Sequence, residues 1–160
     1  LLAAWLSMLV GIAAAYYCIS ELVQVTEARK SLRLQLSYLE QFLAHMTDAE
    51  RIFSYRALRI GRGDQTPLSS FDENAYVAAA EFDRVPLGDL VDGFQTARQQ
   101  TLSMLRGWGP SELERLGTAS GKPVSARALF YIIAGHARHH LRILASRYGI
   151  PVQGDDGAQE

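Results

Sequence analysis

Residues 129–144 read Leu129-Phe-Tyr-Ile-Ile-Ala-Gly-His-Ala-Arg-His-His-Leu-Arg-Ile-Leu144, with apolar residues three and four positions apart. Residues at that spacing share one face of an α-helix, so the stretch predicts a helix with one inward side. His136 and His140 fall within that inward stripe. Ser125 is a typical N-cap before this helix, and Gly149 is expected to end it. The predicted inward stripe consists of Leu129, Ile132, Ile133, His136, His140, Ile143 and Leu144.

A second helical region precedes it, because residues 13–59 contain neither Gly nor Pro. Its apolar positions predict an amphipathic helix over residues 20–60, either continuous or broken at an unmarked point. His45 lies three residues after Phe42 and is therefore expected on the inner face of this helix. The apolar positions are Leu22, Val25, Leu32, Leu36, Leu39, Leu43 and Met46.

Between these regions the sequence alternates turn residues with helical patterns. Residues 61–64, Gly-Arg-Gly-Asp, end the first helix. Asp72 is a predicted N-cap for a short helix over residues 73–82, and a longer helix is expected over residues 87–105. Residues 112–116 predict one more short turn. No segment has strand alternation of useful length, so the predicted class is all-α.

Composition narrows the classes of function and of metal site. The chain has 160 residues, enough for one domain with a hydrophobic core. Its formal net charge is −1, so no basic excess supports binding to nucleic acid. Cys18 is the only cysteine, which excludes an internal disulfide and a cysteine-based zinc site. A metal site would have to use histidines and carboxylates, and a lone thiol is consistent with a cytoplasmic protein.

The first 19 residues carry no charged side chain, and their length approaches that of a transmembrane helix. They are expected either to span a membrane or to form a helix buried in a bundle or in an oligomer interface. We therefore divide the chain into an apolar segment (1–19), a helical bundle (20–150) and a disordered acidic tail (151–160). The predicted location is cytoplasmic, with a membrane-anchored form as the alternative.

The histidines predict a metal site. His136 and His140 are four residues apart and can present both rings to one point. If His45 faces the same interior, a divalent ion at about 2.0–2.1 Å from each nitrogen would satisfy all three rings. His139 could replace His140 as a ligand, because it also lies one turn from His136.

Several motifs resemble the DinB/YfiT-like family: His45-Met-Thr-Asp-Ala-Glu-Arg-Ile-Phe53, Arg56-Ala-Leu-Arg59, Gly63-Asp64, Phe71-Asp-Glu-Asn-Ala-Tyr76 and Ala134-Gly-His-Ala-Arg-His-His-Leu141. The resemblance implies a four-helix bundle with a crossover between its second and third helices. It also implies a divalent ion, zinc or nickel, held by His45, His136 and His140. The chain departs from the family at its front, so the first helix is expected to be atypical.

The resemblance also implies a function, either a metal-dependent hydrolase or a thiol S-transferase acting on a small molecule. Hydrolysis favours a carboxylate near the ion, for which Asp48 and Glu50 are weak candidates; a solvated face or an ion pair with Arg51 is the simpler interpretation. Expected partners are a small-molecule substrate, a low-molecular-weight thiol for the transferase, and a second copy in a homodimer. The candidates for a basic rim that would bind the thiol are Arg56, Arg59 and Arg138.

A function of another class stays open. In a non-catalytic module, the histidines or the ion would only stabilise the bundle, and residues 1–19 would dock a partner helix or a bilayer. A pocket open to solvent at the three rings favours an enzyme. A site closed by Phe42, Phe53 or Tyr131 favours the structural role.

Overall fold

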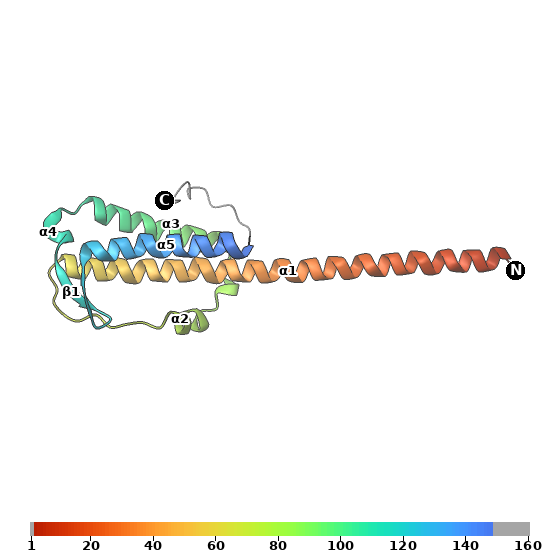
Figure 1. Ribbon diagram of the computed structural model, residues 1–160, viewed down its shortest axis with the longest axis horizontal. Coiled ribbons are helices and arrows are strands. Elements are labelled where there is room, and N and C mark those ends of the chain that lie inside the picture. The colour runs from red at the N-terminus through yellow and green to blue at the C-terminus, as the bar shows by residue number, and fades with distance from the viewer. Residues whose placement is uncertain (1, 149–160) are drawn as a thin grey trace. The chain divides into compact units, whose positions relative to one another are not determined.

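The computed structural model describes residues 2–148 and contains two compact units, residues 1–40 and residues 41–160. In the second unit, helices α3 and α5 lie beside the last part of α1 (Figure 1). The predicted helix end at Gly149 and the predicted tail, residues 151–160, lie outside the described residues. The elements in chain order are α1 (Leu2–Gly61), α2 (Glu73–Ala79), the 3-10 turn η1 (Phe82–Arg84), α3 (Leu87–Arg106), α4 (Pro110–Leu113), β1 (Leu116–Ala119), β2 (Lys122–Ser125) and α5 (Ala126–Tyr148).

Residues 20–60 lie in one unbroken helix, α1, whereas the sequence allowed either a continuous or a broken helix. The helix ends where the Gly-Arg-Gly-Asp motif predicted. Gly63 adopts a left-handed φ of 86°, which glycine adopts without the steric cost of a Cβ. Its N–H donates to the carbonyl of Ile60 at 2.9 Å, and the N–H of Asp64 donates to Arg59 at 3.0 Å. These bonds satisfy carbonyls that the last helical turn leaves free.

The two compact units meet within α1, after residue 40. The division into an apolar segment and a bundle after residue 19 stays a prediction. Periodicity had assigned residues 20–40 to the bundle, but Leu22 and Leu32 are each 66% exposed. An apolar stripe predicts a helix and its inward face, but it does not say whether a partner covers that face.

The crossover between α1 and α3 is fixed to the bundle at two points. The N–H of Leu68 donates to the carbonyl of Thr118, and the N–H of Ser120 donates to that of Leu68, both at 2.9 Å. The second point is Arg56 on α1, whose buried guanidinium donates to the carbonyl of Ser69 at 2.6 Å. These bonds hold the chain that leads into α2.

Helix α2 begins as predicted. The carboxylate of Asp72 accepts hydrogen bonds from the N–H groups of Asn74 and Ala75 at 3.0 and 3.1 Å. The helix ends at Ala79, three residues before the predicted end, because Ala80 adopts an extended conformation with ψ of 126°. Of the remaining predicted residues, only Phe82 is helical, in the separate turn η1.

A β-hairpin, which the sequence analysis missed, precedes α5. Strands β1 and β2 pair antiparallel through four residues each. Ser120 and Gly121 connect them with φ values of 50° and 73°, and positive φ at both central residues is typical of a tight hairpin turn. The short helix predicted over residues 112–116 corresponds to α4, which begins two residues earlier. It also ends earlier, because Leu116 already belongs to β1. After β2, the hydroxyl of Ser125 accepts from the N–H of Ala128 at 3.0 Å, the predicted cap.

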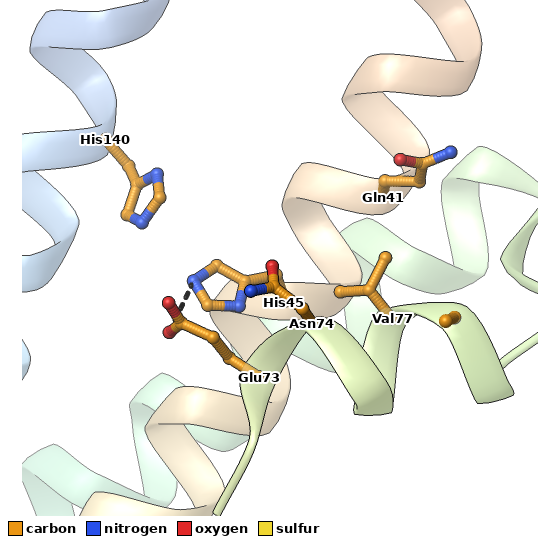
Figure 2. Close-up of a pocket in the computed structure, with 7 residues that line it drawn as sticks. Gln41, His45, Glu73, Asn74, Val77 and His140 are labelled. Atoms are coloured by element: carbon orange, nitrogen blue, oxygen red, sulfur yellow. Dashed lines mark ion pairs between the residues drawn. The ribbon is translucent and has the colours of Figure 1, made fainter.

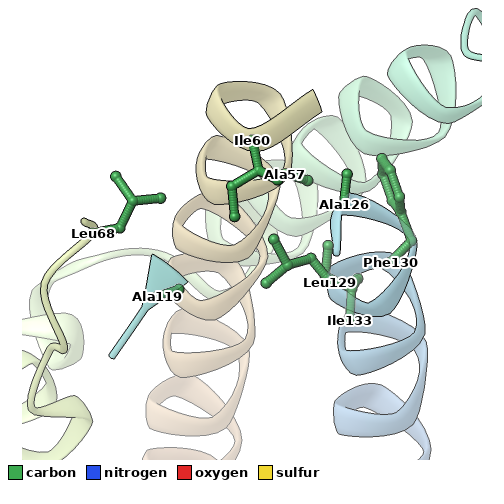
Figure 3. Close-up of a cluster of buried hydrophobic side chains, with 8 residues drawn as sticks. All are labelled: Ala57, Ile60, Leu68, Ala119, Ala126, Leu129, Phe130 and Ile133. Carbon is green, nitrogen blue, oxygen red and sulfur yellow. The ribbon is translucent and has the colours of Figure 1, made fainter. Parts of the chain in front are cut away.

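The hydrophobic core lies at the hairpin end of the second unit (Figure 3). Two glycines allow close packing there. An added Cβ on Gly61 would collide with the indole ring of Trp108, and one on Gly117 would lie 2.6 Å from Cγ1 of Ile60. The core residues are Ala57, Ile60, Leu68, Ala119, Ala126, Leu129, Phe130 and Ile133. His45 lies fifteen residues before Ile60, about 22 Å along the helix, so the core fixes α1 and α5 at a distance from the histidines.

Candidate metal centre

Three histidine rings from two helices meet in the interior of the second unit. Nε2 of His136 lies 3.1 Å from Nε2 of His45 and 3.1 Å from Nε2 of His140. Helix α1 supplies His45, and α5 supplies the other two from adjacent turns. His139 is exposed, and its side chain is not part of this group. The structure therefore brings together the three histidines that the sequence singled out, with His140 rather than His139 as the third.

Hydrogen bonding alone cannot satisfy this arrangement. A ring nitrogen of a neutral imidazole carries either one proton or one lone pair. Nε2 of His136 can therefore make only one of its two 3.1 Å contacts as a hydrogen bond. Two nitrogens that bind one ion tetrahedrally at about 2.05 Å would lie about 3.3 Å apart. The donor set and its spacing fit a divalent ion with a preference for nitrogen ligands.

The environment keeps the rings of His136 and His140 neutral. Burial, followed by the neighbouring His140, His45 and His139, lowers the pKa of His136 to about 4. The pKa of His140 is lowered by burial, with smaller contributions from His45 and His139, and Glu73 opposes this shift. The neutral form is the one that offers a lone pair to a metal, so at neutral pH the rings of His136 and His140 are in the binding form.

Aromatic rings hold two of the histidines in place. The ring of Phe42 meets His140 edge-on at 5.7 Å between centroids, and Phe53 meets His136 at 6.3 Å. On α1, Phe42 comes three residues before His45, and Phe53 comes eight residues after it. They flank the group without closing it, and Tyr131 is 73% exposed.

A pocket of about 420 Å³ opens beside the histidines (Figure 2). Glu73, in the first turn of α2, points its carboxylate toward the site, and Oε2 lies 4.0 Å from Nε2 of His45. The sequence analysis treated Glu73 only as the start of a short helix, and no local pattern marks it as a site residue. The pocket is lined by Gln41, His45, Glu73, Asn74, Val77, Ala78 and His140.

The two carboxylates proposed from the sequence do not line this pocket. Asp48 pairs with Arg51 at 3.5 Å, which is the simpler alternative that the sequence left open. Glu50 is 3% exposed and pairs with Arg98 of α3 at 2.9 Å. For Glu50 both earlier interpretations are wrong, because it is neither solvated nor paired with Arg51. Its partner comes from another helix, which spacing along α1 could not indicate.

The arginines proposed for a basic rim do not line the pocket either. Arg56 is buried, its guanidinium lies 5.6 Å from the ring centroids of Phe53 and Phe71, and burial lowers its pKa. Arg59 is paired with Asp64, and Arg138 is exposed on α5. The described lining of the pocket therefore carries a carboxylate and two amides but no basic side chain.

A family model supplies the identification, because the model of the DinB superfamily matches residues 39–144, about two thirds of the chain. The chain belongs to the DinB superfamily. All three clustered histidines and the crossover lie inside the matched range. The unmatched front agrees with the prediction that the first helix departs from the family.

Among solved structures, this DinB chain is similar to YfiT from Bacillus subtilis, described as a probable metal-dependent hydrolase with an unusual four-helix bundle topology. The two share 18% sequence identity with a TM-score of 0.56, over 70% of this chain and 67% of YfiT. At this identity the likeness establishes the fold alone, and it confirms the predicted four-helix bundle class. No curated protein matched the chain.

Proposed function

We propose that this DinB-superfamily chain binds one divalent metal ion through His45, His136 and His140 and uses it to hydrolyse a small molecule. The observation that carries the proposal is the position of His136 Nε2, 3.1 Å from the ring nitrogens of both other histidines. A metal ion can bind all three ring nitrogens, whereas hydrogen bonding accounts for only one of the two contacts of His136 Nε2. The description of the structurally similar YfiT as a probable metal-dependent hydrolase supports the same reaction class.

The ion is proposed to be zinc or nickel, because both accept imidazole nitrogens as ligands. Three protein ligands leave one coordination position open, which is typical of catalytic rather than structural zinc sites. When bound, such an ion polarises a carbonyl and lowers the pKa of coordinated water to about 7.

Glu73 is the residue that we propose as general base. Its carboxylate lies 4.0 Å from His45 Nε2, too far for a hydrogen bond to the ring but within reach of a water bound to an ion that this nitrogen would hold. In ester hydrolysis the carboxylate would accept a proton from the attacking water as the new carbon–oxygen bond forms. The same proton would pass to the leaving alcohol when the ester bond breaks.

The pocket favours a small, uncharged substrate. Its volume of about 420 Å³ is at the lower end of the range for small-molecule sites. Gln41 and Asn74 offer amide groups at the wall, and Val77 and Ala78 offer apolar surface. Apart from the proposed ion itself, the lining has no lysine or arginine to attract an anionic substrate, which would also meet the Glu73 carboxylate.

The pocket also weighs against the two other functions considered. Transfer of an anionic thiol cosubstrate would require a basic rim, and the lining has none. A purely structural ion would favour a site closed by aromatic rings, but His45 and His140 both line an open pocket. Hydrolysis of a neutral ester or amide is the reaction that these side chains support best.

The test uses metal-free full-length protein and p-nitrophenyl acetate, a neutral chromogenic ester. We expect addition of Zn²⁺ or Ni²⁺ to restore hydrolysis that a chelator removes. His140→Gln should abolish this metal-dependent rate, while the matched variant His139→Gln, altered one residue away on the exposed side of α5, should retain it. Equal loss in both variants, or no metal-dependent rate in the wild type with this ester and a matched amide, would contradict the proposal.

A further inference from the structure

The described start of α1 has no polar face. Residues 5–20 are uncharged, and their large apolar side chains are exposed on much of the helix circumference. This region is part of the helix that is long and apolar enough to cross a membrane, and none of its most apolar window is buried. The large exposed side chains are Trp5, Leu6, Met8, Leu9, Val10, Ile12, Tyr16, Tyr17 and Ile19.

The other side of this stretch is occupied by small uncharged residues rather than by charged ones. A helix that docks on the surface of a soluble bundle needs one apolar stripe and keeps polar residues on the side that faces water. Here an aqueous side would expose Gly, Ala and Cys among large apolar neighbours. The small residues on that side are Ser7, Gly11, Ala14, Ala15 and Cys18. A lipid environment fits a helix that is apolar on all sides.

The residues that follow are those expected at a membrane surface. Tyr16 and Tyr17 lie within five residues of the first charge, Glu21, and amphipathic aromatic rings are enriched where hydrocarbon meets headgroups. Glu27 follows, and then come Arg29, Lys30 and Arg33, which are all exposed. Cations within about 15–20 residues of a span favour the cytoplasmic side and attract anionic lipids.

The length of the uncharged segment also suits a bilayer. Residues 2–20 of α1 carry no charged side chain, and such a helix extends about 28 Å, close to the thickness of the hydrocarbon layer. We propose that this segment inserts across a lipid bilayer and leaves residues 41–148, with the histidine site, on the cytoplasmic side.

Fractionation of cells that produce the full chain tests the insertion. We expect the protein in the membrane pellet, resistant to alkaline carbonate and released by detergent. Val10→Lys combined with Ala13→Lys places two charges in the middle of the segment and should move most of the protein to the soluble fraction. The matched variant Gln24→Lys with Thr26→Lys adds the same charge beyond the segment and should stay in the membrane.

The single cysteine provides a second test that does not depend on fractionation. In inverted membrane vesicles, the thiol of a Cys18→Ser, Val10→Cys variant lies in the middle of the segment. It should resist a membrane-impermeant maleimide until detergent is added, because a thiol in hydrocarbon is neither ionised nor reachable. A Cys18→Ser, Ser31→Cys variant should react before detergent, because Ser31 lies among the cytoplasmic cations.

Two outcomes would overturn the proposal. One is recovery of the wild-type chain in the soluble fraction, either as a monomer or as an oligomer in which a second copy covers residues 5–20. The other is reaction of the cysteine introduced at residue 10 in sealed vesicles at the same rate as the cysteine introduced at residue 31.

Discussion

Oε2 of Glu73 lies 4.0 Å from Nε2 of His45, although 28 residues of chain separate them. The carboxylate arrives from the crossover and the imidazole from α1, so the site depends on the path that the crossover takes. In the proposed function, His45 holds the ion and Glu73 accepts a proton beside it. These roles can be separated by experiment.

Glu73→Gln should lower the rate of metal-dependent ester hydrolysis by about 10²- to 10⁴-fold, the usual contribution of a general base. The amide keeps the size of the side chain and removes its ability to accept a proton. Because the Glu73 side chain is 58% exposed, the free energy of unfolding should change by less than about 0.5 kcal/mol. The measurement is the rate with saturating Zn²⁺, alongside metal stoichiometry.

Glu81→Gln is the control for this change. Glu81 is exposed just after α2, pairs with Arg84 and does not line the pocket. It should hydrolyse the ester at the wild-type rate. If Glu73→Gln also keeps the wild-type rate, Glu73 is not the base.

The metal-free protein should lose stability as the pH falls from about 6.5 toward about 4. The pKa of His136 is near 6.5 in the unfolded chain and about 4 in the fold, so between these values the unfolded state binds more protons. Protonation therefore favours unfolding in that window and has little effect above it. Urea denaturation at a series of pH values measures the slope.

His136→Gln should flatten this dependence, because it removes the group whose pKa is most depressed. His139→Gln, on the exposed side of the same helix, should leave most of the slope in place. An equally steep slope in both variants would assign the pH dependence to other groups.

Gly61→Ala should destabilise the fold by about 1–3 kcal/mol, a typical cost of overpacking. The added methyl would collide with the Trp108 indole, which is packed against the core. Gly93→Ala is the matched control within α3, where an added Cβ meets nothing within 4 Å. That variant should be neutral or more stable by up to about 1 kcal/mol, because alanine is the better helix former. Thermal denaturation of both compares the two sites.

Arg56→Ala should loosen the crossover and cost about 1–3 kcal/mol of stability, since it leaves the Ser69 carbonyl without its donor. It also removes the guanidinium between Phe53 and Phe71. Hydrogen exchange should accelerate in residues 65–80. Arg51→Ala, which truncates an exposed arginine on the same helix, should leave exchange there unchanged.

The helices could be predicted because their signals are local. Apolar spacing gave α1, α3 and α5, and the side chains of Asp72 and Ser125 marked two helix starts that hydrogen bonds now confirm. The hairpin had weaker signals, because its strands have four residues each and its turn, Ser120-Gly121, resembles any surface loop. Such short strands are stabilised by their surroundings rather than by their own propensity.

The site residues also divide into those that local patterns predict and one that depends on distant contacts. His136 and His140 are one turn apart, so the sequence alone placed them on one face, and the inward stripe of α1 indicated His45. Glu73 could not be found because its position depends on the Leu68 and Arg56 contacts that hold the crossover. Those are contacts between distant parts of the chain, which periodicity within one helix does not encode.

Metal content is the most direct measurement of the central claim. Elemental analysis of metal-replete full-length protein, repeated on the His136→Gln and His139→Gln variants, tests whether the three clustered rings bind the ion. We predict one Zn²⁺ or Ni²⁺ per chain in the wild type and in the His139 variant, and none in the His136 variant. One ion per chain in the His136 variant, or no stoichiometric ion in the wild type, would contradict this account.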